Sequence, residues 1–82
     1  MTVIAQQQSK HTGRWFRCRR EKPQFYVIER TDHRWSPTQI TAPDVQWDEQ
    51  ATWWSPREEF VVAEMRRLVR HDHQVLSVIS TQ

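Results

Sequence analysis

The sequence predicts an α+β fold, in which a small antiparallel sheet of three to five short strands packs one face against a single amphipathic helix. The helix is predicted over about residues 56–71, where apolar side chains recur at helical spacing. Two strands are predicted on either side of Pro23, because aromatic and β-branched residues gather there. The 82 residues have room for one domain with a single hydrophobic core.

The start of the chain predicts a flexible N-terminal tail. Residues 1–12 are mostly polar, and a run of glutamines at residues 6–8 is low in complexity. Residues 3–4 are compatible with an added edge strand, but the segment is too short to favour one. We therefore assign residues 1–12 to the tail and residues 13–82 to a single α+β domain.

Residues 14–20 and 25–30 are predicted to form a β-hairpin around the turn at Pro23. In the first strand, alternation places Phe16 and Cys18 on the covered face, where Cys18 would be an inert buried thiol. The second strand is apolar at consecutive positions, which is typical of a central strand that is covered on both faces. The side chains expected on the opposite face of the first strand are Trp15, Arg17 and Arg19.

The chain between residues 31 and 54 gives weaker signals. A Trp-Ser-Pro sequence at residues 35–37 favours one helical turn or a short strand, which the next proline ends. Residues 45–48 and 51–54 are predicted to form two short strands. Residues 74–80, rich in apolar and β-branched side chains, are predicted as a last strand.

The start of the helix carries the strongest local signal in the chain. Ser55 is a preferred N-cap, Pro56 suits the first helical position, and Glu58 completes a capping box with Ser55. An apolar stripe then follows, and we expect it to face the sheet. Its members are Val61, Met65, Leu68 and Val69.

Charge is unevenly distributed along the chain. Residues 1–30 carry seven Lys and Arg against two acids, which gives +5, and residues 31–60 carry two against six, which gives −4. The net charge of +2 is too small to indicate a polyanionic partner by itself. We expect the basic and acidic parts to pair across the fold.

Nothing in the sequence indicates export or membrane insertion. The N-terminus lacks the basic start and long apolar run of a signal peptide, and no segment approaches the roughly 20 apolar residues of a membrane span. Cys18 is the single cysteine, which excludes an internal disulfide and fits a reducing compartment. We therefore expect a cytoplasmic protein that does not associate with membranes.

The sequence carries no motif for catalysis or for a cofactor. Its single glycine excludes a Gly-rich loop that would cradle phosphates, and no pair of carboxylates stands out from ordinary surface. The four histidines have none of the usual zinc spacings, and His71 is explained by the favourable position of a cation at a helix C-terminus. We therefore expect no catalytic residues, no metal ligands and no cofactor.

We expect the protein to dock onto a larger protein partner as an adaptor, regulator or inhibitor. Tryptophans are favoured anchors of binding interfaces, and Trp47, Trp53 and Trp54 lie in the acidic part of the chain. Neighbours in a strand point to opposite faces, so one of Trp53 and Trp54 is expected to be buried and the other outside. Arg17 and Arg19 would add charge complementarity. A homodimer is a further option, because a shared interface would stabilise a small core.

The alternative is a small nucleic-acid-binding protein. Arginines neutralise phosphates, and an adjacent aromatic ring can stack on a base. In this alternative the site residues are Trp15, Arg14, Arg17, Arg19, Arg20 and Lys22. The two hypotheses differ in salt dependence, because phosphate-driven binding weakens steeply as salt rises and a tryptophan-anchored interface changes little.

Overall fold

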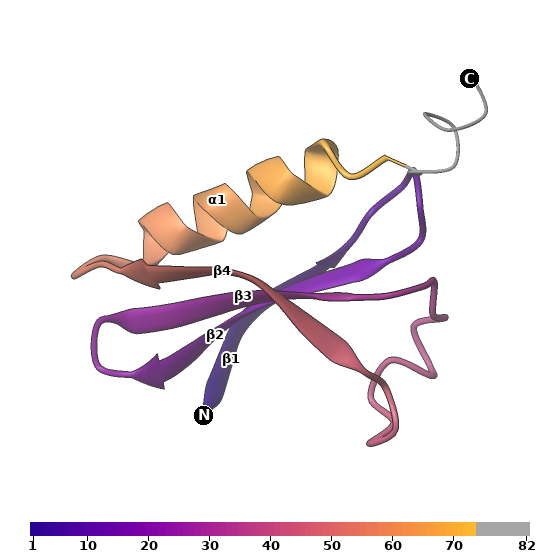
Figure 1. Cartoon of the computed structure of the whole chain (residues 1–82), viewed down its shortest axis with the longest axis horizontal. Coiled ribbons are helices and arrows are strands. Elements are labelled where there is room, and N and C mark those ends of the chain that lie inside the picture. The colour runs from indigo at the N-terminus through magenta and orange to yellow at the C-terminus, as the bar shows by residue number, and fades with distance from the viewer. Residues whose placement is uncertain (74–82) are drawn as a thin grey trace.

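A computed structural model describes residues 1–73 of the chain and confirms the α+β arrangement. Four antiparallel strands follow one another in the order β1-β2-β3-β4, and one helix packs on a single face of the sheet (Figure 1). The elements are β1 (Thr2–Gln8), β2 (Trp15–Lys22), β3 (Phe25–Thr31), β4 (Trp47–Trp54) and α1 (Glu58–Arg70). The last strand predicted over residues 74–80 lies outside the described residues.

Strand β1 occupies most of the segment that the sequence assigned to a flexible tail. It pairs with β2 from Thr2 opposite Arg20 to Gln8 opposite Trp15. The Gln8 side-chain amide also donates hydrogen bonds to the carbonyl oxygens of Gly13, at 3.0 Å, and Trp35, at 3.1 Å. Only residues 3–4 pointed to an edge strand in the sequence, because the rest of β1 is mostly polar and is held by backbone pairing.

The turn between β1 and β2 depends on the one glycine of the chain. Gly13 has a φ of 76°, in the left-handed region that other residues rarely adopt. A side chain at this position would also meet Arg34, whose Cβ lies 2.7 Å from the place of the missing Cβ. The turn is closed by two backbone hydrogen bonds, from Ser9 N–H to the Arg14 carbonyl and from Gly13 N–H to the Ser9 carbonyl.

The hydrophobic core lies between the sheet and α1. Alternation in β2 and β3 directs one set of side chains toward the helix, and the helix contributes its apolar stripe, as the sequence predicted. Cys18 is fully buried in this core, which confirms its predicted position. The core side chains are Phe16, Cys18, Tyr26, Ile28, Val61, Met65 and Val69, with Leu68 partly buried beside them.

The helix begins two residues later than predicted, and the predicted capping box is absent. Glu58 is the first helical residue, and the N-cap Arg57 makes no side-chain capping hydrogen bond. The Ser55 hydroxyl instead accepts a hydrogen bond from Arg57 N–H at 3.1 Å. The Ser55 N–H, which a capping box would use, donates to the Gln24 carbonyl at 2.9 Å. Pairing with the β2–β3 turn therefore overrides the local capping signal.

Strand β4 is continuous where the sequence predicted two short strands. It runs from Trp47 opposite Thr31 to Trp54 opposite Phe25. The register shifts between Ile28 and Glu29, so a β-bulge takes up the polar residues that resembled a turn. Because the strand is unbroken, Trp47 and Trp54 lie at opposite ends of it.

The loop between β3 and β4 lies against the face of the sheet that the helix does not cover, which we call the outer face. Its apolar residues Ile40 and Val45 are buried. Together with Trp47 of β4 and Arg17 of β2, they line a cavity of about 460 Å³. The predicted turn after Trp35 is present, because Ile40 N–H donates to the Ser36 carbonyl at 3.1 Å.

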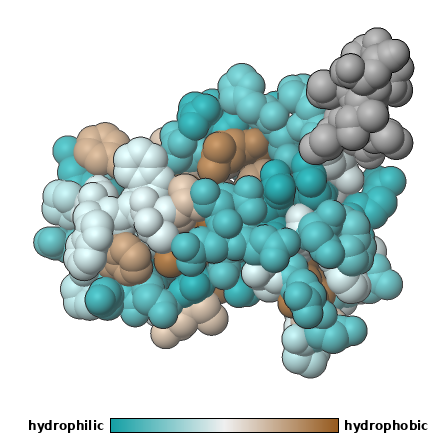
Figure 2. Space-filling model, in the orientation of Figure 1, coloured by the Kyte–Doolittle hydropathy of each residue, from teal (hydrophilic) through white to brown (hydrophobic). Residues whose placement is uncertain are grey.

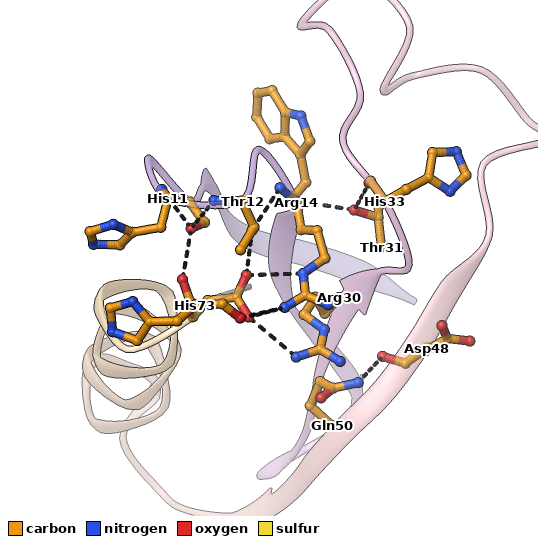
Figure 3. A network of polar contacts seen from close by, with 12 residues as sticks. His11, Thr12, Arg14, Arg30, Thr31, His33, Asp48, Gln50 and His73 are labelled. Carbon is orange, nitrogen blue, oxygen red and sulfur yellow. Dashed lines mark hydrogen bonds and ion pairs between the residues drawn. The ribbon is translucent and has the colours of Figure 1, made fainter. Parts of the chain in front are cut away.

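A buried carboxylate joins the end of α1 to the sheet. Asp72, 6% exposed, accepts a hydrogen bond from the Thr12 hydroxyl at 2.6 Å. The same carboxylate forms ion pairs with Arg14 at 2.6 Å and Arg30 at 3.3 Å. Figure 3 shows these contacts converging from the β1–β2 turn and β3 on the residues after the helix. The network fixes the C-terminal end of α1 over the sheet.

Candidate functional site

Four aromatic side chains lie on the two faces of the molecule at the end where β4 leads into α1, and we call this cluster the aromatic end. It consists of Phe25, Trp53, Trp54 and Phe60. Trp54 is 67% exposed, Phe60 60% and Trp53 41%, so three large rings face solvent. Figure 1 shows β4 passing directly into the start of α1 at this end, where Figure 2 shows pale and brown side chains among hydrophilic ones.

The exposure of both adjacent tryptophans follows from the position of the helix. Trp53 lies opposite Tyr26 on the helix side of the sheet, and Trp54 lies opposite Phe25 on the outer face. However, the main contacts of α1 are with β1 and β2, and Trp53 stays 41% exposed. The prediction that one of the two tryptophans would be buried is therefore wrong.

Cations, and not the expected acids, lie over the rings of the aromatic end. The rings of Phe25 and Trp54 are 4.7 Å apart, and the Lys22 ammonium lies 5.6 Å and 5.7 Å from their centroids. The Arg57 guanidinium lies 5.0 Å from the Phe60 centroid. Such cation–π contacts keep the rings and the charges in place at the surface.

Trp47 is not part of this cluster. It lies at the other end of β4, where it is half-buried, and the Arg17 guanidinium carbon is 4.2 Å from its ring centroid. The structure thus separates the predicted anchors into Trp53 and Trp54 at one end and Trp47 under Arg17 at the other. Packed rings of this kind stabilise the fold and have little area left for a partner.

The two arginines predicted to give charge complementarity share one internal carboxylate. Glu29 of β3 is buried and pairs with Arg17 at 2.6 Å and with Arg19 at 3.1 Å on the outer face. Arg19 also pairs with Glu21. All of these partners lie within residues 1–30, so the network does not join the basic part of the chain to the acidic part as expected. Among the described ion pairs, Arg20 with Glu58, at 3.8 Å on the surface, joins the two parts.

The residues of the nucleic-acid alternative do not share one surface. Trp15, Arg17 and Arg19 lie on the outer face, and the Trp15 indole N–H donates to the Trp35 carbonyl at 2.7 Å. The remaining two arginines point to the helix side. Arg14 pairs with Asp72, and Arg20 approaches Glu58 at 3.8 Å, whereas Lys22 belongs to the aromatic end.

Neither a metal centre nor a reactive thiol is found in the part of the chain that the structure describes. His11 and His73 lie with ring centroids 4.7 Å apart, but no third ligand joins them to form a metal-binding group within residues 1–73. Burial, and then the charge of Glu58, raise the pKa of the Cys18 thiol from 9.0 to about 11. A buried thiol with a raised pKa is a poor nucleophile at neutral pH.

The sequence did not predict that Lys22, Phe25 and Phe60 belong to a candidate protein-binding site. Phe60 had a usable signal, because an apolar residue directly before Val61 falls outside the stripe that faces the sheet. Phe25 and Lys22 had none, since their position depends on the pairing of β3 with β4.

Comparison with known proteins identifies no relative of the chain. No protein-family model matches the chain, and no curated protein and no solved structure matches it significantly. Within residues 1–73, the structure contains no helix that is both long and apolar enough to cross a membrane. The function is therefore inferred from the surface of the molecule.

Proposed function

We propose that the protein is a non-catalytic interaction module that docks onto a larger protein partner through the aromatic end. The single observation that carries this proposal is the joint exposure of Trp53, Trp54 and Phe60 at one end of a small sheet. Large rings that remain in contact with water on a small domain favour an interface, because burying them against a partner is strongly favourable.

The chemistry of the aromatic end fits a protein surface as its target. Tryptophan and arginine are over-represented among the residues that dominate binding energy. Here Trp54 stacks near Phe25, which restricts its rotation before binding and lowers the entropy that docking would cost. Lys22 stands at the rim beside Arg57, which also pairs with Glu59 at 3.7 Å, so a partner that sets a carboxylate opposite Lys22 next to apolar residues is complementary.

The test is capture of partners by the immobilised full-length chain from a nuclease-treated extract of the source cells. We expect Trp54→Ala and Trp53→Ala to lower the captured partner at least about tenfold, as hot-spot truncations do. Trp35→Ala is the matched control, because it removes the same ring from the other end of the molecule, where Trp35 stacks on His33. Partner capture that is equal for all three variants would refute the proposal, provided circular dichroism shows them folded.

The nucleic-acid alternative has weaker support, because the Arg17 and Arg19 guanidinium groups are already paired with Glu29. Their release from Glu29 would offset part of the energy gained from phosphates. The alternative predicts capture that disappears on nuclease treatment and falls steeply between about 50 and 200 mM salt. The docking proposal predicts capture that survives both conditions.

A further inference from the structure

A second surface, distant from the aromatic end, runs along the first strand of the sheet. A groove of about 840 Å³ separates β1 from α1. Four consecutive β1 residues, Ala5 to Gln8, line one wall. Since neighbouring side chains of a strand point to opposite faces, this wall contains the backbone edge of β1 in addition to side chains. The buried Met65 and Val69 lie at the base, and Arg66 and Arg70 form the opposite wall.

The β1 wall presents backbone groups that have no strand partner within residues 1–73. In that part of the chain β1 pairs with β2 alone, so its other edge is unpaired. Thr2–Gln8 contains no proline and no charged residue, two of the usual devices that prevent an edge strand from pairing. A bulge is a third device, but the one register shift of β1, between Val3 and Ala5, precedes Gln6 to Gln8 of the groove wall. An edge of this kind accepts an added strand through backbone hydrogen bonds.

The remaining walls of the groove are basic. Lys10, His11, Arg66 and Arg70 line it, and no acidic residue does. In the described residues 1–73, no carboxylate forms an ion pair with Lys10, Arg66 or Arg70. Most other arginines of the described chain are paired, so uncompensated positive charge is concentrated beside the free edge.

We propose that this groove binds an extended, acidic segment of a partner protein as an added strand on β1. The backbone of the segment pairs with the free edge of β1. Its carboxylates lie opposite Lys10, Arg66 and Arg70. This surface does not include the aromatic end, so the inference does not rest on the proposed function above.

A peptide fits the groove better than a nucleic acid does. A strand edge offers alternating N–H donors and carbonyl acceptors, and a peptide backbone satisfies both, whereas a phosphodiester supplies acceptors alone. The groove also continues toward Glu58 and Glu59, which line its next section together with Ile4 and Val62. These two carboxylates would repel any anion, so the acidic residues of the segment must lie in the section lined by Lys10, Arg66 and Arg70.

The test starts from selection of random peptides of about 12 residues, displayed on phage, against the full-length chain. We expect the enriched peptides to combine Asp or Glu with β-branched residues, and to perturb the backbone amide resonances of β1. The double variant Arg66→Glu with Arg70→Glu should weaken their binding at least about tenfold. Arg67→Glu is the matched control, because Arg67 lies on the same helix but pairs with Glu64 at 2.9 Å, and it should leave peptide binding unchanged.

Several outcomes would overturn the proposal. Enriched peptides without an excess of acids, or binding that the Arg66 and Arg70 reversals leave intact, would exclude an acidic strand in the groove. Competition by a single-stranded oligonucleotide in place of the acidic peptides would identify a nucleic-acid site instead. A dimer in sedimentation that the same reversals dissociate would identify a second copy as the occupant. Peptide binding that requires removal of residues 74–82 would identify this segment as the occupant.

Discussion

Arg14 and Asp72 form a two-point ion pair between the turn that precedes β2 and the residues that follow α1. Arg14 Nη2 lies 2.6 Å from Asp72 Oδ1, and Arg14 Nε lies 3.1 Å from Asp72 Oδ2. The Asp72 side chain is 4% exposed, so the carboxylate depends on these partners in place of water. The pair holds the helix against β1 and β2, and this position leaves Trp53 uncovered.

Removal of the Asp72 carboxylate should therefore destabilise the whole fold. We expect Asp72→Ala to lower the free energy of unfolding by about 3 kcal/mol, because it leaves the Arg14 and Arg30 charges without their partner. Urea denaturation followed by circular dichroism measures the change. Asp44→Ala, at an exposed position outside any ion pair of the described chain, should change it by less than about 0.5 kcal/mol. Equal losses of stability in the two variants would show that the Asp72 carboxylate does not stabilise the fold.

Met65 tests the position of the core. Its side chain is 1% exposed and lies between α1 and the sheet, so Met65→Ala should lower the free energy of unfolding by about 2–5 kcal/mol. Phe60→Ala shortens a large side chain on the same helix, but the Phe60 ring is mostly exposed and should cost under about 1 kcal/mol. A larger loss from Phe60→Ala in thermal or urea unfolding would contradict the described packing of α1.

Arg17 tests the network on the outer face. Its guanidinium both pairs with Glu29 and stacks over Trp47, and a lysine keeps the charge without the planar group. We expect Arg17→Lys to lower the free energy of unfolding by about 1 kcal/mol and to change the fluorescence of Trp47. Arg67→Lys alters an exposed pair with Glu64 and should be nearly neutral. If both substitutions changed the free energy of unfolding equally, the stacking of Arg17 on Trp47 would not contribute to stability.

The buried thiol of Cys18 makes the protein less stable at high pH. In the unfolded chain the thiol ionises near its ordinary pKa of 9.0, whereas in the folded protein the pKa is about 11. The unfolded state therefore releases this proton first, so stability is fully present below about pH 9 and falls as pH rises toward 11.

The measurement is urea unfolding at about pH 8 and about pH 10.5 for the parent chain and for Cys18→Ala. Because lysine and tyrosine also titrate in this range, the difference between the two proteins isolates the thiol. The parent should lose more stability between these pH values than Cys18→Ala does. In addition, a thiol reagent should not label Cys18 at neutral pH until the protein unfolds, and rapid labelling of the folded protein would show that the thiol is accessible.

Much of the fold was predictable because its signals are local. Alternation in β2 identified Phe16 and Cys18 as core residues, and the spacing of Val61, Met65 and Val69 identified the buried stripe of α1. Strand β1 was missed because pairing with β2, and not its polar side chains, makes it a strand. The capping box at Ser55 was wrong because the Ser55 N–H pairs with Gln24, which a local pattern does not reveal.

The candidate site was predictable only in part. Exposed tryptophans were expected as anchors, and Trp53 and Trp54 are exposed. However, their cationic surroundings were not expected, because Lys22 reaches Trp54 only through the pairing of Phe25 with Trp54. The groove beside β1 was also invisible in the sequence, since it joins Arg66 and Arg70 to a strand about 60 residues earlier in the chain.

The sequence by itself determined which faces of β2 and α1 are apolar, because side-chain periodicity depends only on the local backbone. The tertiary structure alone decided where α1 lies on the sheet. The core side chains and the contacts of Asp72 hold the helix over β1 and β2, which exposes Trp53 beside Trp54 and places two arginines along β1. Both candidate surfaces follow from this position, because contacts between distant residues set it and no local spacing encodes it.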